Sequence, residues 1–380
     1  MTLLSGTGMG GADILALDFS IRLHRMGHHV IFCCPSDNVL ISTAEESGLE
    51  IKLLDRQSAA DMEGLKDFIK YCAGEKIDII NAHHSEGRHF LTASRFFSFF
   101  SPGTRPKTVF MRHCLRGGVP LAGFLLDNFS CDLSVAVSEA VRKSFLVGGI
   151  LPGRIVTVHG AINIEKFENV PPDKIEDIRR KYAKKTAGTF NIGIVGRFHE
   201  SRLEPGKPSI KRHEVLFRAL AEKKLEGYDF NLLAVGPSDA RSIEIMKEVA
   251  RLSGLDESAL TVCGFHQDVA PFYKIMDISV LPSPREGLGL AVVEAMAAGV
   301  PVIGAGGGGI KEIISDGADG FLFRPGNSGE LAEKIKTLMD DARLRTLFAQ
   351  RGRQKVRELF DIEKNSRLLE EVFYRLLSLP

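Results

Sequence analysis

The chain has 380 residues, 44% of them apolar, and at roughly 100–200 residues per domain this length predicts two domains that can each bury a core. Its 49 basic and 48 acidic residues give a formal net charge of +1, which argues against nucleic acid as the main partner, because nucleic-acid-binding proteins carry a basic excess. The six cysteines have no zinc-ligand spacing, no apolar run reaches the roughly 18 residues that span a bilayer, and no signal-peptide pattern is evident. We therefore expect reduced thiols and a cytoplasmic protein.

Short apolar runs alternate with amphipathic stretches along the chain. The predicted strands cover residues 30–33, 77–81, 108–111, 133–137, 155–158, 191–195, 230–235, 278–281 and 300–303. They are rich in Val and Ile and lack polar alternation, as strands covered on both faces do. Amphipathic stretches such as residues 13–26 and 138–146 predict helices between them. This alternation indicates an α/β fold with two Rossmann-like, doubly wound domains. The adjacent Cys33 and Cys34 lie in the run HVIFCCP, which we interpret as a buried strand and not as a redox centre.

The expected domain boundary lies near residue 170. The segment ENVPPDK carries a Pro-Pro pair and is followed by a charged, helix-like stretch and then by a new strand, as in an inter-domain linker. We assign residues 1–168 to an N-terminal domain and residues 169–362 to a C-terminal domain. Open parallel sheets bind ligands beyond the carboxyl ends of their strands, so two such domains facing each other predict an active site in the cleft between them.

Glycines and histidines follow the predicted strands of the N-terminal half. The segment TLLSGTGMGGA places Gly10 and Gly11 between a short strand and a helix, where they form either a phosphate-binding loop or a plain tight turn. INAHHSEG and TVFMRHCLRGG place His83, His84 and His113 after strand ends. We expect these histidines to face the cleft, with one of the adjacent pair serving a structural role.

Residues 87–126 contain six basic residues and no acidic residue, and the part HFLTASRFFSFF adds five phenylalanines. A buried helix with a basic rim is one interpretation of this segment. The other is a surface that contacts a membrane or an anionic, lipid-linked substrate.

The densest signal is SPREGLGLAVVEAMAAGVPVIGAGGGGIKEII, which begins at Ser283. A strand leads into a loop with Glu286, and a helix follows that carries Glu294 about two turns from its start and ends at Gly299. The backbone N–H groups of Gly287, Leu288, Gly289 and Leu290 at the helix N-terminus form an anion site suited to a diphosphate. Each carboxylate can accept two hydrogen bonds from a vicinal diol, which suits a sugar or a ribose. The alternative interpretation is that Glu286 is an ordinary acidic residue in a loop and that Glu294 is an ordinary solvent-exposed acidic residue on a helix.

A second motif, NIGIVGRFHESRLEPGKPSIKRHEVLFRAL, places Arg197 after a strand and Lys211 before a helix. Two fixed cations facing a diphosphate would stabilise the charge that develops on it as it leaves. Lys207 is an alternative to Lys211, but KRHEVLFRAL fits the start of the helix better.

Together these motifs resemble the retaining glycosyltransferases of family 4 (group 1), which have the GT-B fold. The resemblance is most specific over residues 191–325 and weaker over residues 1–165. It implies that Glu286 contacts hydroxyls of the donor sugar, that Glu294 binds the nucleotide ribose, and that Arg197 and Lys211 hold the diphosphate. It also implies that His113 contacts the donor sugar.

By the same resemblance, Gly10 and Gly11 reach the donor phosphate or the acceptor, and backbone near residues 262–266 lies at the nucleobase. The loop before Lys211 is longer than usual in the family. The Asn-Gly-Ile-Asp turn before the linker is replaced here by a sequence that begins with His159, which leaves the role of this turn open.

The resemblance further implies a reaction, partners and a place in the cell. The reaction is transfer of a sugar, with retention of configuration, from a UDP- or GDP-linked donor to a hydroxyl of a glycan or lipid-linked acceptor, in cell-surface polysaccharide, lipopolysaccharide or glycolipid synthesis. No metal and no other cofactor is expected, and the protein would be cytoplasmic or peripheral at the inner face of the membrane. A helix over residues 363–380 would pack back on the N-terminal domain. The alternatives are a nucleotide-sugar epimerase of similar shape and a non-catalytic nucleotide-sugar binding protein.

Overall fold

The computed structural model describes residues 1–3, 10–54, 62–98, 105–117, 128–184, 188–198, 211–237 and 239–379. The chain divides into two compact units, an N-terminal unit (Met1–Ile162 with Ile362–Pro380) and a C-terminal unit (Asn163–Asp361). The division lies before the position expected from the Pro-Pro linker, because helix α7 (Ile164–Glu168) already belongs to the C-terminal unit.

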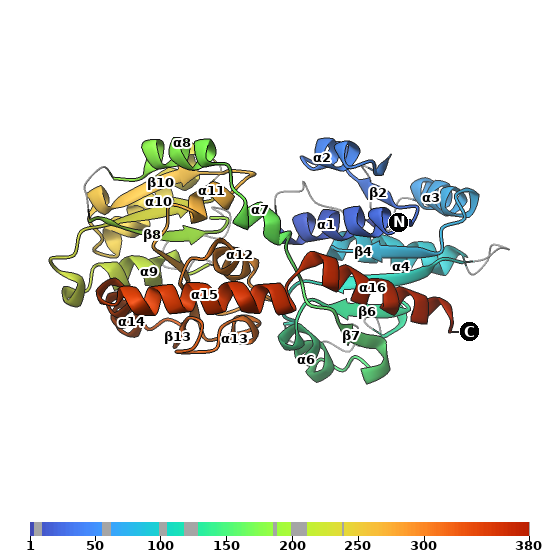
Figure 1. The fold of residues 1–380 in the computed structure, drawn as a ribbon. Coiled ribbons are helices and arrows are strands. Elements are labelled where there is room, and N and C mark those ends of the chain that lie inside the picture. Colours follow the sequence, from blue (N-terminus) through green and yellow to red (C-terminus); the bar gives the residue numbers. More distant parts are fainter. Residues whose placement is uncertain are drawn as a thin grey trace. The chain divides into compact units, whose positions relative to one another are not determined.

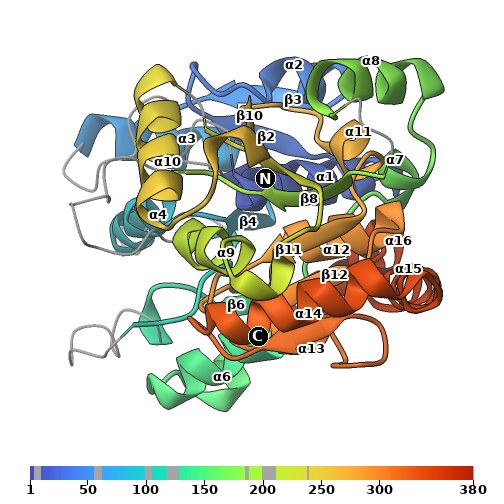
Figure 2. The ribbon, with the colours of Figure 1, turned by 90° about the vertical axis from the view of Figure 1, so that its left-hand side faces the viewer.

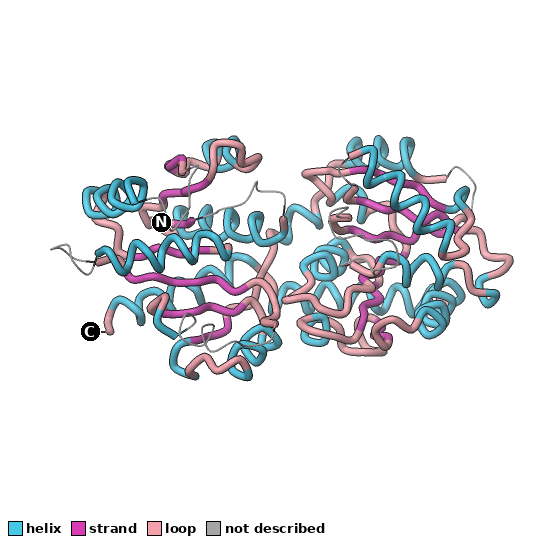
Figure 3. The backbone as a smooth tube through the Cα atoms, turned by 180° about the vertical axis from the view of Figure 1, so that it is seen from behind, coloured by secondary structure: helices cyan, strands magenta, loops and turns pink. Residues whose placement is uncertain are grey.

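In the described part of the N-terminal unit, seven strands form one parallel sheet in the order β3-β2-β1-β4-β5-β6-β7 (Figure 1, Figure 3). Their bounds, in sheet order, are Glu50–Leu53, Ile31–Cys34, Thr2–Leu3, Ile79–Ala82, Lys107–Arg112, Leu133–Ala136 and Ile155–Thr157. This strand order is that of a doubly wound sheet. The interior strands β2 and β6 are buried along their whole length, including Cys33 and Cys34, as the apolar runs predict.

The helices described in this unit are α1 (Gly11–Arg25), α2 (Ile41–Glu46), α3 (Met62–Gly74), α4 (Ser85–Ser98), α6 (Glu139–Val147) and α16 (Ile362–Leu377). The last of them packs along α1 (Figure 1). His28 lies 2.6 Å from Glu370 and Arg22 lies 2.9 Å from Glu363, so polar contacts flank this packing. The C-terminal helix is therefore part of the N-terminal unit although 199 residues of the other unit, Asn163–Asp361, separate it in sequence from Ile162.

The residues described in the C-terminal unit form a six-stranded parallel sheet in the order β10-β9-β8-β11-β12-β13. Their bounds, in sheet order, are Leu260–Gly264, Phe230–Val235, Phe190–Val195, Ile278–Leu281, Val302–Ala305 and Phe321–Phe323. The helices are α7, α8 (Pro172–Tyr182), α9 (His213–Leu220), α10 (Ala240–Leu252), α11 (Ala270–Tyr273), α12 (Leu290–Ala298), α13 (Ile310–Ile313), α14 (Ser328–Asp340) and α15 (Ala342–Leu359).

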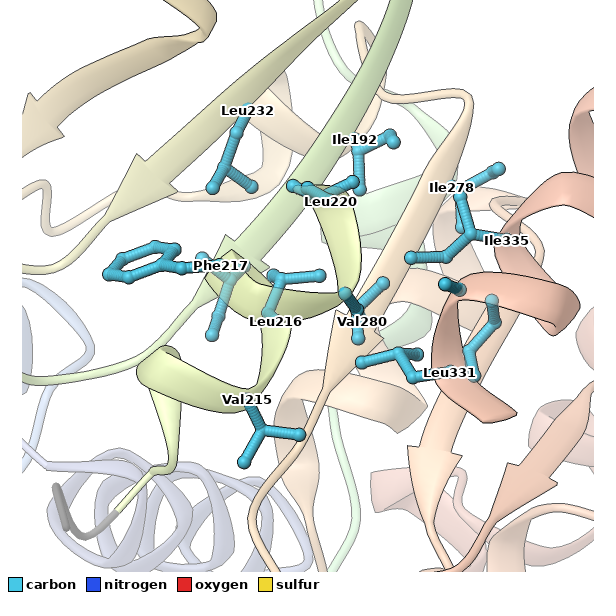
Figure 4. Packing of buried hydrophobic residues seen from close by; sticks show 14 of the residues in the cluster. Ile192, Val215, Leu216, Phe217, Leu220, Leu232, Ile278, Val280, Leu331 and Ile335 are labelled. Carbon is cyan, nitrogen blue, oxygen red and sulfur yellow. The ribbon is translucent and has the colours of Figure 1, made fainter. Parts of the chain in front are cut away.

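Helices α9 and α14 lie side by side on one face of this second sheet (Figure 2). Figure 4 shows the apolar face of α9, including Leu216 and Leu220, against strand residues such as Val280. Leu331 and Ile335 of α14 complete this core from the neighbouring helix (Figure 4). This cluster joins α9 and α14 to strands β8 and β11.

The α/β, doubly wound prediction is confirmed for both sheets. Three of the described strands were not predicted, namely β3, β10 and β13, and all three lie at the edges of their sheets. The residues of β3 are only partly buried or exposed, so this strand lacks the continuous apolar run that marks an interior strand. Among the described residues, no helix combines the length and apolar character needed to cross a bilayer.

Candidate active site

The donor-binding residues predicted in the C-terminal half lie near one edge of the second sheet. Strands β8, β11 and β12 are neighbours and run parallel, so the loops that follow them emerge at the same edge. These loops contain Arg197 after β8, Glu286 after β11 and a run of glycines after β12. The strand order therefore places sequence segments that are about a hundred residues apart at one locus.

Lys211 and Glu286 are in direct contact. The Lys211 Nζ donates to Glu286 Oε1 at 2.6 Å, and the side chains are 27% and 13% exposed. Lys211 lies two residues before α9, as the sequence predicts, and Arg197 is exposed at the end of β8. Lys207, the alternative to Lys211, lies outside the described residues.

The loop that carries Glu286 leads directly into α12. Gly289 precedes the first helical residue, Leu290, with a left-handed φ of +105° that glycine adopts without strain. The N–H groups of Gly287, Leu288, Gly289 and Leu290 thus stand at the N-terminus of a helix, where anions are stabilised. The helix ends at Gly299, which also has a left-handed φ (+81°). Glu294 is the fifth residue of α12, so it lies just over one turn into the helix and not two turns as expected.

Glu294 is held by a tyrosine that the sequence motifs did not identify. The hydroxyl of the buried Tyr273 lies 2.9 Å from Glu294 Oε2 and 3.2 Å from the carbonyl oxygen of Ala291. Burial raises the pKa of Glu294, and the hydrogen bond from Tyr273 and the charge of Lys166 oppose that rise. The contact orients one carboxylate oxygen.

The glycine run after β12 packs its backbone directly against the backbone of the Glu286 loop. The sequence motifs did not predict this contact. A Cβ atom on Gly308, whose φ is +54°, would lie 2.2 Å from the carbonyl oxygen of Glu286, and one on Gly309 would lie 2.3 Å from that of Gly287. The N–H of Gly309 also donates to the carbonyl oxygen of Glu286 at 3.0 Å. The four consecutive glycines were the available signal, because such a run indicates close backbone approach.

A second close approach of two backbone segments lies next to Arg197, at Gly196 and Gly236. A Cβ on Gly236, whose φ is +140°, would lie 2.0 Å from the carbonyl oxygen of Gly196. Beside Lys211, Arg212 has a left-handed φ of +58°, which costs about 1–3 kcal/mol in a residue with a side chain. Backbone of this kind persists only where its surroundings enforce it, as at binding sites.

The segment implied to approach the nucleobase, residues 262–266, spans the end of β10. The His266 Nε2 lies 3.0 Å from the carbonyl oxygen of Cys263 and 3.2 Å from the Tyr182 hydroxyl. Its ring also packs against Phe272 at 4.5 Å. The side chain of His266 thus packs its loop against α8 and α11.

In the N-terminal unit, Gly10 and Gly11 open helix α1. The N–H of Gly10 donates to Asp13 Oδ2 at 3.0 Å, and Asp13 Oδ1 lies 2.6 Å from His84 Nε2. The buried Asp13 therefore ties the start of α1 to the end of β4. The loop of residues 4–9 lies outside the described residues.

His83 and His113 meet at the ends of the neighbouring strands β4 and β5. His83 Nδ1 lies 3.0 Å from His113 Nε2, and Asn81 Nδ2 lies 3.1 Å from His83 Nε2. Burial lowers the pKa of His83 well below its usual value and that of His113 to about 3, so both rings are neutral at pH 7. His113 is half-buried and His83 fully buried.

The basic side chains described within residues 87–126 are engaged by the protein itself. Arg112 is buried and donates to Ser134 Oγ at 3.2 Å. The guanidinium groups of Arg112 and Arg116 both lie over the Phe145 ring. Arg105 pairs with Asp132 at 3.4 Å. Lys107 donates to the carbonyl oxygen of Leu379, and Arg88 contacts His89. The side chains of Arg95 and of four of the five phenylalanines lie outside the described residues, so these contacts favour the structural interpretation for the described part alone.

A cavity of about 360 Å³ lies elsewhere in the N-terminal unit. Residues that precede β2 and β4, together with one face of α16, line it. It therefore opens at the amino edge of the first sheet, opposite the edge that carries Gly10, His83 and His113, and it is not part of the candidate site.

Curated proteins with similar sequences include named glycosyltransferases. The glycosyltransferase CapM of capsular polysaccharide biosynthesis in Staphylococcus aureus is 28% identical over 233 residues, which are 60% of this chain and 57% of that protein. The N-acetyl-alpha-D-glucosaminyl L-malate synthase of Bacillus anthracis is 32% identical over 262 residues, which are 65% of this chain and 66% of that protein. The chain thus spans less than two thirds of the length of these relatives.

Solved structures share the whole fold. A glycosyltransferase of Rickettsia africae superimposes with a TM-score of 0.85 at 21% identity, covering 100% of this chain and 98% of that one. HepE of Anabaena, solved with UDP and glucose, gives a TM-score of 0.81 at 20% identity, with 98% of each chain covered.

Two family profiles match the chain in succession. Residues 9–166 match the profile described as "Glycosyltransferase Family 4", and residues 189–341 match that described as "Glycosyl transferases group 1". Together with the two Rossmann-like sheets and the relatives above, these matches show that the chain belongs to the group 1, family 4 glycosyltransferases of the GT-B fold.

Proposed function

We propose that this protein transfers a sugar from a nucleotide-diphosphate sugar to an acceptor hydroxyl with retention of configuration. The observation that carries the proposal is the contact of Lys211 with Glu286 beside the N-terminus of α12. A cation, a carboxylate and the N–H groups at a helix N-terminus suit two parts of such a donor: a diphosphate needs positive charge and N–H donors, and a sugar needs a hydrogen-bond acceptor for its hydroxyls.

In this proposal, different groups of residues bind different parts of the donor. Arg197, Lys211 and the N–H groups of residues 287–290 hold the diphosphate and stabilise its charge as the glycosidic bond breaks. Glu286 accepts hydrogen bonds from the sugar, and Glu294 accepts them from the ribose. In the N-terminal unit, His113 contacts a sugar oxygen, and Gly10 and Gly11 lie against a phosphate or the acceptor.

Two relatives support the choice of partners. HepE was solved with UDP, and CapM is named for capsular polysaccharide synthesis. We propose a UDP- or GDP-linked donor and a glycan or lipid-linked acceptor in cell-surface polysaccharide synthesis, with the protein at the cytoplasmic side of the membrane. Sedimentation with anionic vesicles tests the membrane part, and binding that survives neutralisation of both Arg95 and Arg105 would contradict a role for this basic segment.

We propose that the leaving diphosphate is balanced by Arg197 and Lys211 without a metal ion. Incubation with a chelator followed by desalting is expected to leave turnover unchanged. Turnover that falls on chelation and returns with a divalent cation would contradict this part of the proposal alone.

A panel of nucleotide sugars tests the whole proposal. Thermal shift identifies the donor, because a ligand that binds the folded state raises its stability by mass action. The identified donor is then incubated with the protein, and the released or transferred sugar is followed by NMR at the anomeric carbon. A product with the anomeric configuration of the donor supports the proposal, whereas an inverted product or an epimerised nucleotide sugar contradicts it. Tight donor binding without turnover over any acceptor or water would instead indicate a binding protein.

A further inference from the structure

Three polar side chains form a chain at the carboxyl ends of β4 and β5. The Asn81 Nδ2 lies 3.1 Å from His83 Nε2, and His83 Nδ1 lies 3.0 Å from His113 Nε2. The two imidazole rings are stacked, with centroids 5.2 Å apart and planes 29° from parallel. Asn81 and His83 are buried and His113 is half-buried, so the chain leads from the interior of the sheet to a partly exposed ring.

Neutral imidazoles restrict how protons can lie along this chain. A neutral ring carries a proton on one nitrogen and a lone pair on the other. Burial keeps both rings neutral, because it lowers the pKa of His83 and brings that of His113 to about 3. Each of the two short contacts therefore needs one N–H and one bare nitrogen or oxygen, and only two proton arrangements satisfy both contacts.

The two arrangements run in opposite directions. In the first, the Asn81 amide donates to His83 Nε2, His83 Nδ1–H donates to His113 Nε2, and His113 keeps its proton on Nδ1. In the second, His113 Nε2–H donates to His83 Nδ1, His83 Nε2–H donates to Asn81 Oδ1, and His113 Nδ1 is bare. The ring of His113 thus presents either a donor or an acceptor from Nδ1.

The orientation of the Asn81 amide selects between them. In the structure the Nδ2 faces His83, and the Oδ1 is buried with no hydrogen-bond partner among the described residues. Reversing the amide would satisfy the oxygen but would bury both N–H bonds of Nδ2 in that unpartnered position. Buried N–H groups are left unpaired more rarely than carbonyl oxygens, so the first arrangement is favoured.

We propose that Asn81 and His83 are positioning residues that lock His113 in the Nδ1–H tautomer, so that His113 acts as a fixed hydrogen-bond donor to a ligand oxygen. That the oxygen belongs to a sugar hydroxyl or ring rests on the proposed function. The lock itself follows from the three side chains and is independent of the reaction. A neutral donor of this kind binds an uncharged hydroxyl or ring oxygen without attracting free anions.

NMR of the full chain with ¹⁵N-labelled histidine rings tests the lock directly. Long-range proton–nitrogen correlations at pH 7.5 show which ring nitrogen carries the proton, and His83→Gln and His113→Gln variants assign the signals. We expect a single tautomer of His113 with the proton on Nδ1. A proton on Nε2, or two tautomers in exchange, would overturn the proposal.

Removal of the Asn81 amide provides a second test of the proposal. Asn81→Ala is expected to release His113 into a mixture of tautomers, whereas Asn128→Ala, which removes another buried amide of the same unit, leaves it locked. The buried His213 of the other unit is an internal reference whose signals stay unchanged in both variants. An unchanged His113 tautomer in folded Asn81→Ala would show that Asn81 does not select it. Absence of turnover with every nucleotide sugar would reject the proposed function and leave the tautomer result intact.

Discussion

The Nζ atom of Lys211 lies 2.6 Å from Oε1 of Glu286, so two side chains proposed to bind different parts of one donor neutralise each other in the free protein. Both side chains keep some exposure, 27% and 13%, so solvent reaches the pair. A diphosphate carries more negative charge than one carboxylate, so it can compete with Glu286 for Lys211.

Glu286→Gln is expected to lower sugar transfer about a hundredfold or more, since a neutral amide accepts weaker hydrogen bonds from the sugar in the transition state. Nucleotide binding should remain, because Lys211 is then freed for the diphosphate. Turnover of the identified donor and titration calorimetry with the free nucleotide check the two parts.

The neighbouring Arg285→Gln is the matched control for this variant, because Arg285 is exposed on the same loop. It should change neither turnover nor binding by more than about twofold. Equal losses in both variants would mean that the loop, and not the Glu286 carboxylate, is responsible.

Tyr273→Phe is expected to weaken nucleotide binding about tenfold, since hydrogen bonds to charged groups contribute about 1.5–3 kcal/mol and the Tyr273 hydroxyl orients Glu294 at 2.9 Å. The turnover number at saturating donor should hardly change, because a ribose contact acts equally in the ground and transition states. Calorimetry with the nucleotide and steady-state kinetics measure the two effects. Tyr228→Phe, which loses a hydroxyl bonded to Asp340 on the surface, should affect neither.

Gly308→Ala is expected to destabilise the C-terminal unit by about 3 kcal/mol or more and to abolish turnover, since its Cβ would lie 2.2 Å from the carbonyl oxygen of Glu286 at a φ of +54°. The control Gly317→Ala separates the effect of a steric clash of the new Cβ from the effect of backbone strain at a positive φ. Gly317 also has a positive φ, +74°, but a Cβ there meets nothing within 4 Å. That control should lose only about 1–2 kcal/mol and keep its activity. Denaturant unfolding and a turnover assay compare the two.

Stability should fall as the pH drops below about 6.5, because buried histidines stay neutral in the folded chain. Burial lowers the pKa of His213, like that of His113, to about 3, whereas the unfolded value is about 6.5. Between these values the unfolded state binds more protons, so acidification favours unfolding.

At pH 5.5, one unit below the unfolded pKa, His213 alone should cost the C-terminal unit about 1.4 kcal/mol. His213→Phe, which keeps an aromatic ring between Phe198 and Phe217, should remove that share of the pH dependence. Denaturant unfolding at pH 7.5 and 5.5 measures it. His89→Gln, at an exposed histidine, should leave the slope unchanged, and an unchanged slope in His213→Phe would contradict the assignment.

Most interior strands and the Glu286–Glu294 motif can be predicted from the sequence, because they depend on residue types within one short segment. A strand covered on both faces is mostly apolar, as in β2 and β6. Glycines mark both ends of α12, which begins after Gly289 and ends at Gly299. The edge strand β3 has no such pattern, since solvent reaches part of it.

Local pattern therefore suffices for the class of fold, for the strand–loop–helix frame and for which residue types stand in the loops at strand ends. It says nothing of the contact between Tyr273 and Glu294, of the support that Gly308 gives to Glu286, or of the pairing of His83 with His113. Those contacts join segments from different elements, and they exist only because strand order and helix packing bring the segments together. A carboxylate or an imidazole acquires its orientation and its pKa from such neighbours, so the chemistry of the site is decided by the tertiary structure.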